Sequence, residues 1–159
     1  MSSDQGAVVK SFPNDLEIVL STVFPHPVEL VFDAHSKVEH IQNTFAPFGE
    51  EVIKCEIDLK VGGTYHYVML PENGPECSFR GTFLEIVPGK KLQQTWIFDG
   101  WPELEAIETM TFEPVNSGTR YSWSLKFAND KDRSRFAKTD GIESNFEVMR
   151  KYLASIDNQ

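Results

Sequence analysis

The sequence predicts a single α+β domain in which a curled antiparallel sheet wraps around a long C-terminal helix. From residue 51 to residue 127, apolar and polar residues alternate with a period of two, interrupted by turns that contain Gly or Pro. After residue 130 the apolar residues recur with the period of a helix instead. Strands joined by short turns must be antiparallel neighbours, and a long antiparallel sheet twists and curls. The amphipathic helix can then fill the concave face of the sheet.

The composition is that of one ordinary globular domain. The chain has 159 residues, of which 40% are hydrophobic and 12% aromatic, and a chain of this length buries enough surface to fold without a disulfide or a metal ion. Residues 1–14 are polar and interrupted by Gly and Pro, so a flexible lead-in is predicted there. Residues 15–156 are predicted to form the domain.

One strand and two short helices are predicted before the long sheet. Residues 16–23 alternate as a strand. Pro27 follows that strand and suits the first turn of a short helix. Ser36 can cap a second short helix over residues 37–43.

Six further strands are predicted between Gly-Gly, Pro-Gly and Asn-Ser-Gly turns. In the first of them, Cys55 shares a face with Ile53 and Ile57, and it is interpreted as a small buried hydrophobic residue. The six strands cover residues 52–59, 64–70, 77–87, 92–98, 104–115 and 120–127.

The last helix is predicted to begin near residue 133 or residue 140 and to end near residue 155. Charged residues separate the apolar positions of its stripe, as expected for a helix with one buried face. The stripe consists of Phe136, Ile142, Phe146, Met149 and Leu153.

Charge and hydropathy exclude several classes of partner. The chain has 15 Lys and Arg against 24 Asp and Glu, a formal net charge of −9, which argues against nucleic acid because affinity for phosphate comes from clustered basic residues. No stretch approaches the roughly 18 apolar residues of a membrane span, and the N-terminal residues lack the apolar segment of a secretory signal. A cytoplasmic location without a membrane partner is expected, and a homodimer is left open.

Five segments in a fixed order resemble one known family. The chain is similar to the SRPBCC (START-like, helix-grip) superfamily, and within it to the branch of heat-shock-protein-90 ATPase activator homologues. The segments are FPHPVELVFDAHSKVEHI (24–41), CEIDLKVGGTYHYVM (55–69), FRGTFLEIVPGKKL (79–92), TMTFEPVNSGTR (109–120) and GIESNFEVMRKYL (141–153).

The resemblance implies a helix-grip fold with the order β-α-α-β6-α and a largely apolar pocket between the sheet and the long helix. Family members mostly bind hydrophobic small molecules. Some are cyclases or hydrolases, and the eukaryotic namesake stimulates a chaperone ATPase. A chaperone partner is therefore implied by the resemblance alone, and no cofactor is expected.

These considerations predict binding of a hydrophobic or amphipathic small molecule in a cavity between the curled sheet and the C-terminal helix. Large rings with polar tips at alternate strand positions suit an amphipathic cavity. The predicted ligand-binding residues are Tyr65, Tyr67, Met69, Phe79, Trp96, Phe98, Glu108, Met110, Trp123, Ile142 and Phe146.

Glu108 is the one carboxylate in the predicted lining. Alternation places it on an otherwise apolar strand face, and an isolated buried carboxylate is costly unless it is paired or protonated. One interpretation is that a bulge turns Glu108 to solvent, or that Arg80 or Lys126 pairs with it. The other is that Glu108 is a polar contact in the pocket or a general acid with a raised pKa.

Two other functions remain as alternatives to the binding of a small molecule without catalysis. A cyclase or hydrolase would use Glu108 with Arg80 or His66, although alternation turns His66 to the outer face of its strand. An interaction module would act like the chaperone activator. No metal site is predicted, because His35 and His40 are five positions apart rather than the four that place two ligands on one helix face.

Overall fold

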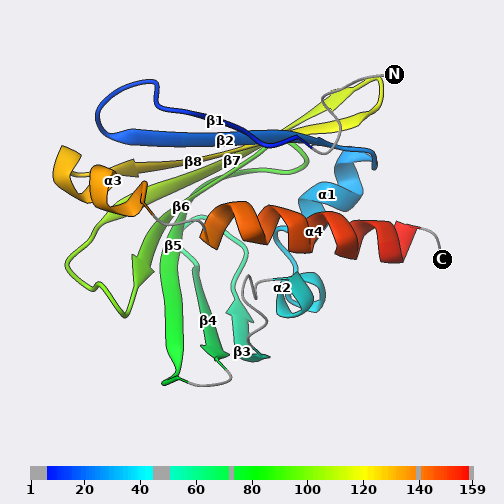
Figure 1. The fold of residues 1–159 in the computed structure, drawn as a ribbon. Helices are drawn as coiled ribbons and strands as arrows, with labels where there is room; N and C mark the ends of the chain where they lie inside the picture. Colours follow the sequence, from blue (N-terminus) through cyan, green and yellow to red (C-terminus); the bar gives the residue numbers. More distant parts are fainter. Residues whose placement is uncertain (1–6, 45–50, 72–73, 139–140, 158–159) are drawn as a thin grey trace.

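The computed structural model describes residues 7–44, 51–71, 74–138 and 141–157. Within these residues, eight strands form one antiparallel sheet in the order β1-β2-β8-β7-β6-β5-β4-β3, with β1 and β3 at its two edges (Figure 1). The strands are β1 (Val9–Ser11), β2 (Glu17–Phe24), β3 (Glu51–Ile57), β4 (Thr64–Leu70), β5 (Cys77–Val87), β6 (Lys91–Phe98), β7 (Ala106–Val115) and β8 (Gly118–Phe127).

The longest helix lies across the concave side of the curled sheet, with the two short N-terminal helices beside it (Figure 1). This arrangement confirms the predicted α+β fold and its order of strand, two helices, six strands and long helix. The helices are α1 (Val28–Ala34), α2 (Val38–Thr44), α3 (Asp130–Phe136) and α4 (Gly141–Asp157).

Strand β1 was not predicted from the sequence. Its three residues pair antiparallel with β2, Val9 opposite Ser21 and Ser11 opposite Val19. A strand of this length is too short for alternation to show, and all three of its residues are exposed. It therefore extends the sheet within the segment that the sequence predicts to be a flexible lead-in.

Helix α3 is a separate element rather than the start of α4. The side chain of Asn129 accepts a hydrogen bond from the backbone N–H of Asp132 and so caps α3. Phe136 therefore leaves the predicted apolar stripe of α4. It packs instead with its ring edge-on to Trp96, 5.7 Å between centroids, and against Phe127 at 5.3 Å.

Strand β3 departs from the predicted alternation. The register with β4 shifts between Val52 and Lys54, and such an irregularity moves the following residues to the other face. Ile53 is consequently 44% exposed, and Cys55 is only partly buried. Cys55 keeps the inner face with Ile57 and packs against the smaller core cluster, and the prediction that Ile53 shares this face is wrong for this reason.

Gly81 allows two neighbouring strands to approach closely. It lies opposite Tyr65 in the pairing of β4 with β5. A Cβ atom at this position would lie 1.9 Å from the carbonyl oxygen of Thr95 and 2.7 Å from Tyr65 Cε1. The Tyr65 hydroxyl donates to that same Thr95 oxygen at 2.7 Å, so the missing side chain admits a hydrogen bond across the bend of the sheet.

The apolar core is divided into two clusters. The larger one joins β2, α1, β6, β7, β8 and α4, and it includes Phe24, Trp123 and Phe146. The smaller one joins α2, β4 and β5 around Ile41 and Tyr67. A single helix against a curled sheet does not fill all of the concave space, and the candidate site lies where the two clusters meet.

Candidate ligand-binding cavity

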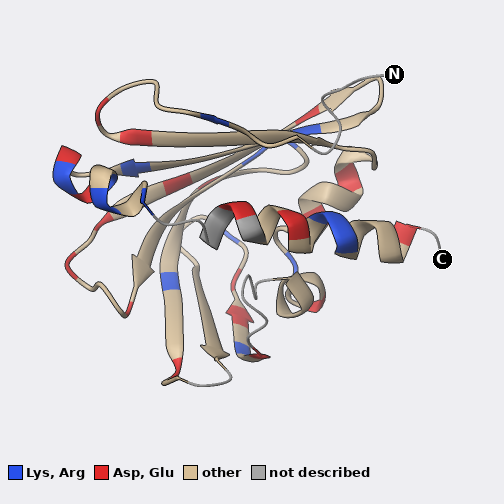
Figure 2. Cartoon of the chain, in the orientation of Figure 1, with Lys and Arg blue, Asp and Glu red and all other residues tan. Residues whose placement is uncertain are grey.

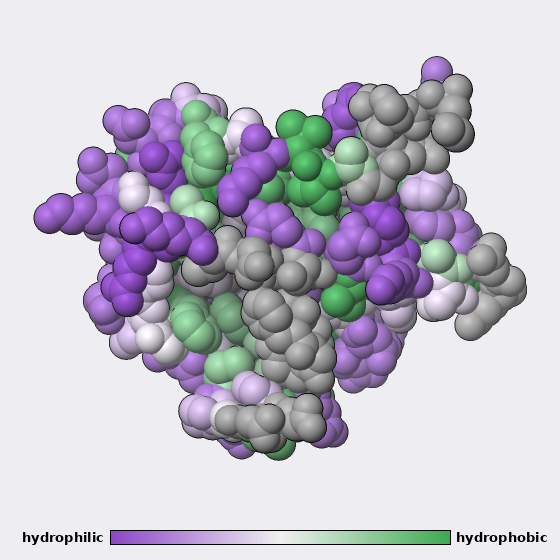
Figure 3. All heavy atoms as spheres, in the orientation of Figure 1, coloured by the Kyte–Doolittle hydropathy of each residue, from purple (hydrophilic) through white to green (hydrophobic). Residues whose placement is uncertain are grey.

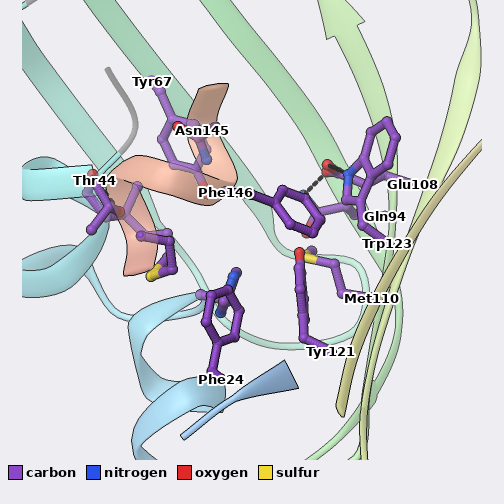
Figure 4. Close-up of a pocket in the computed structure, with 13 residues that line it drawn as sticks. Phe24, Thr44, Tyr67, Gln94, Glu108, Met110, Tyr121, Trp123, Asn145 and Phe146 are labelled. Atoms are coloured by element: carbon purple, nitrogen blue, oxygen red, sulfur yellow. Dashed lines mark hydrogen bonds between the residues drawn. The ribbon is translucent and has the colours of Figure 1, made fainter. Parts of the chain in front are cut away.

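A cavity of about 60 Å³ separates the curled sheet from α1, α2 and α4 (Figure 4). At about 10–15 Å³ for each water, this is space for about four to six water molecules. The sheet supplies Phe24, Tyr67, Gln94, Glu108, Met110, Tyr121 and Trp123. The helices and their ends supply His35, Ile41, Thr44, Asn145, Phe146 and Met149.

Glu108 forms the polar centre of the cavity wall. Strand β7 pairs without a bulge with β6 and β8, so Glu108 keeps the inward direction of its neighbours Ala106 and Met110. Its Oε1 accepts from the Gln94 side-chain amide at 2.7 Å, and its Oε2 accepts from the Trp123 indole N–H at 2.5 Å (Figure 4). Both donors come from the adjacent strands, directly or diagonally opposite.

The protonation of Glu108 is set by two opposing effects. Burial raises the pKa of the Glu108 carboxyl, and the hydrogen bonds from Trp123 and Gln94 oppose that shift because they favour the charged form. Burial is the larger effect. Burial, followed by the charge of Glu108, also raises the pKa of Tyr121. Glu108 keeps part of its surface accessible, and that surface belongs to the cavity wall.

His35 follows α1 and lines the cavity as a neutral ring. Its Nδ1 lies 2.7 Å from the carbonyl oxygen of Val31, which can only accept, so Nδ1 carries the proton. Burial lowers the pKa of His35 from 6.5 to about 4, outweighing this hydrogen bond. The ring stacks on Tyr121 with centroids 4.3 Å apart. Nε2 of His35 is therefore a hydrogen-bond acceptor at neutral pH.

Asn145 brings a further acceptor to the wall from α4. Its side-chain oxygen is buried and has no hydrogen-bond partner among the residues that the structure describes. A buried polar atom without a partner costs about 1–3 kcal/mol. In Figure 4 the Asn145 side chain lies next to Tyr67, on the side of the cavity away from Glu108.

Residues 25–154 match the family described as Activator of Hsp90 ATPase homolog 1-like protein. The match covers the described elements from α1 to most of α4, including every strand that contributes to the cavity except β2. The chain belongs to this family. The resemblance inferred from the five sequence segments is thereby confirmed.

Solved structures of bacterial proteins share the fold of this family member. A protein from Nitrosomonas europaea is 22% identical, with a TM-score of 0.82 over 93% of this chain and 100% of the other. A protein from Rhodobacter sphaeroides is 16% identical, with a TM-score of 0.87 over 94% and 99%. One from Chromobacterium violaceum is 25% identical, with a TM-score of 0.71 over 86% and 96%. A search of curated proteins finds no significant match.

The predicted ligand-binding residues of this family member fall into three groups in the structure. One group lines the cavity: Tyr67, Glu108, Met110, Trp123 and Phe146. Tyr65 and Met69 are buried in the sheet beside it, as alternation predicts, and Tyr65 contacts Tyr67 with centroids 5.0 Å apart. The third group, Phe79, Trp96 and Phe98, packs together away from the cavity. The side chain of Ile142 lies outside the described residues.

The three catalytic candidates do not meet. His66 lies between the inward-facing Tyr65 and Tyr67 and pairs with Arg80, which is exposed on the outer face of the sheet. Glu108 faces the opposite, concave side. Neither Arg80 nor Lys126 contacts Glu108, whose partners are Gln94 and Trp123.

Several lining residues were not predicted. Tyr121 shares the strand face of Trp123, so alternation was a sufficient signal for it. His35, Ile41, Thr44, Asn145 and Met149 belong to helices or helix ends, and they reach the cavity only through the way the helices dock on the sheet. A sequence pattern does not contain that docking geometry.

Two further observations concern other classes of site. Among the residues that the structure describes, no three His, Cys, Asp or Glu side chains come together in a way that could hold a metal ion. No helix in the described part of the chain is both long enough and apolar enough to cross a membrane.

Proposed function

We propose that this protein binds an amphipathic small molecule in the cavity between the curled sheet and α4. The observation that carries the proposal is the position of Glu108, a carboxylate with two hydrogen-bond donors in a wall that is otherwise mostly aromatic and apolar. Such walls, with a few convergent polar groups, are typical of small-molecule sites.

Stability alone does not account for this polar cluster. Replacing a buried charged or polar group by apolar residues of similar volume is often neutral or stabilising. The presence of a carboxylate in the core is therefore weak evidence that Glu108 stabilises the fold. A ligand that binds to the oxygen atoms of Glu108 explains its presence better.

The cavity wall can adapt to ligands larger than a few waters. Met110 and Met149 both line it, and methionine side chains are unbranched and adjust to irregular shapes. A single aromatic ring with a polar substituent is accordingly the expected minimum ligand.

Binding is favoured over the predicted cyclase or hydrolase reaction. That reaction would need Glu108 to act with His66 or Arg80, and these two side chains lie on the other face of the sheet. The family description also names an activator of an ATPase. No feature of the described residues favours that activity here, since Lys and Arg are interspersed with Asp and Glu rather than gathered on one surface (Figure 2).

Native mass spectrometry of the freshly purified protein tests the proposal by detecting a bound small molecule. Displacement of an apolar fluorescent dye provides a second measurement. Met110→Trp fills the cavity and should abolish dye binding, whereas Thr111→Trp adds the same ring to the outer face of the same strand and should not. The proposal is overturned if no compound is carried and the dye does not bind, or if both variants bind dye as the wild type does.

A further inference from the structure

The described part of the cavity wall contains one carboxyl group and no side chain that is positively charged at neutral pH. Among the described lining residues, none is Lys or Arg, and the only groups other than tyrosine that ionise readily are Glu108 and His35. His35 is neutral at pH 7, because burial lowers its pKa to about 4. The described lining therefore has either a net negative charge or none, and none of its residues would neutralise an anion.

Glu108 has unused capacity to accept hydrogen bonds. An ionised carboxylate has about four lone-pair sites, and among the described residues Gln94 and Trp123 are the donors to them, one to each oxygen. Each oxygen can therefore accept a further hydrogen bond, and a ligand that donates one would fill this capacity.

The apolar part of the wall is suited to a cation. Aromatic ring faces attract ammonium groups that lie within about 6 Å of the ring centroid. Tyr121 and Phe146 lie close together, with centroids 5.4 Å apart. Figure 4 shows both rings on the side of the cavity toward which the Glu108 carboxylate points, whereas Trp123 turns its N–H edge to that carboxylate.

Two further polar atoms of the wall are acceptors. Nε2 of His35 is an acceptor, and the Asn145 oxygen is a buried acceptor without a partner among the described residues. An ammonium group has three N–H donors and no acceptor. It is therefore complementary to Glu108 and to these two acceptors, whereas a carboxylate or a phosphate would be repelled by an ionised Glu108.

We propose that the molecule bound in this cavity carries a protonated amine, which pairs with Glu108 and packs against the rings of Tyr121 and Phe146. This inference rests on the proposed binding function and specifies the class of its ligand. The other titratable groups near Glu108 are Tyr65 and Tyr67 on β4, Tyr121 on β8 and His35 after α1. None of these carries a positive charge at neutral pH.

Three probes of matched size test the inference: benzylamine, benzyl alcohol and benzoate. Binding is followed at pH 7 by calorimetry and by the NMR shift of the Trp123 indole N–H. Benzylamine should bind about tenfold more tightly than benzyl alcohol, because it adds an ion pair and a cation–π contact in a site shielded from water. Benzoate should bind more weakly than either.

Two variants locate the source of the preference. Glu108→Gln keeps the side-chain shape and should remove the preference for the amine while leaving binding of the alcohol. Glu113→Gln, an exposed position on the same strand, makes the same change of charge outside the cavity and should keep the preference. The ranking of the three probes on the wild type needs no variant, so the test does not depend on the folding of Glu108→Gln.

The possible failures are distinguishable. If benzyl alcohol or benzoate binds the wild type as tightly as benzylamine, the inference about the amine is wrong and the binding function stands. If Glu108→Gln keeps the full preference, the amine is held elsewhere and the inference is again wrong. If none of the three probes binds although the dye does, the inference about the amine is wrong and the binding function stands. If the dye does not bind either and no compound is carried, the binding function fails together with the inference.

Discussion

The indole N–H of Trp123 on β8 donates to Oε2 of Glu108 on β7, with the two heavy atoms 2.5 Å apart. Trp123 lies directly opposite Met110 in the strand pairing, so the hydrogen bond runs diagonally across the sheet to the residue two positions before Met110. Trp123 thereby helps to hold the carboxylate in place.

Trp123→Phe removes the indole donor and keeps a ring in the wall. The indole hydrogen bond favours the charged form of the carboxyl, so its loss should raise the pKa of Glu108 further. The free energy of unfolding at pH 7 should fall by about 1–3 kcal/mol, since a charged group loses a donor and the smaller ring leaves unfilled space. Carboxyl-carbon NMR titration and urea unfolding measure the two effects.

A double-mutant cycle separates the hydrogen bond from the loss of ring volume. Trp123→Phe is compared in the wild type and in Glu108→Leu, which has no oxygen atom to accept the indole N–H. The loss of stability should be smaller in the Glu108→Leu background, with a coupling energy of about 1 kcal/mol. Equal losses in the two backgrounds would show that Trp123 acts on stability through packing alone.

The sheet could be predicted from the sequence because each strand is bounded by a turn and half buried. Alternation is sufficient to orient Tyr65, Tyr67 and Glu108 toward the concave side. Strand β1 and the irregularity at Val52 escaped prediction for the same reason: both involve too few residues to produce a period.

Only part of the candidate site could be predicted from the alternation of residues along the strands. Alternation shows which residues face inward, but it does not show which of them pack against one another and which border empty space. Trp96 faces inward as Trp123 does, yet it packs among Phe79, Phe98 and Phe136 and does not line the cavity. His35 enters the cavity wall through the docking of α1, which no local pattern encodes. On the face shown in Figure 3, the apolar areas of the described residues are separate, so surface hydropathy does not mark the site either.

His35 should make the protein sensitive to acid. Its folded pKa of about 4 lies below the ordinary value of 6.5, so the unfolded chain binds more protons between these two pH values. The free energy of unfolding therefore falls as the pH drops through this window, by at most about 3 kcal/mol from this group. His35→Phe retains a ring against Tyr121 and should remove this part of the acid sensitivity.

Urea unfolding of the wild type and of His35→Phe between pH 6.5 and pH 4 measures the difference. His66→Gln, on the outer side of β4, is the matched histidine control and should follow the wild type. A wild type and a His35→Phe variant that lose stability in parallel over this range would contradict the prediction.

Glu108 should have the opposite effect on the pH dependence of stability. Burial raises its folded pKa above the ordinary value of 4.5, so the folded protein holds its proton more tightly than the unfolded chain does. The stabilisation from the protonated carboxyl is fully present below pH 4.5 and is lost as the pH rises through the folded pKa. Glu108→Gln does not titrate, so the stability of the wild type relative to this variant should decrease from pH 4.5 toward neutral pH.

Glu113→Gln, measured by the same urea unfolding, controls for the change in net charge. A relative stability that stays constant or increases over that range would mean that the Glu108 carboxylate is already compensated within the protein, and the case for a cationic ligand would lose its electrostatic basis.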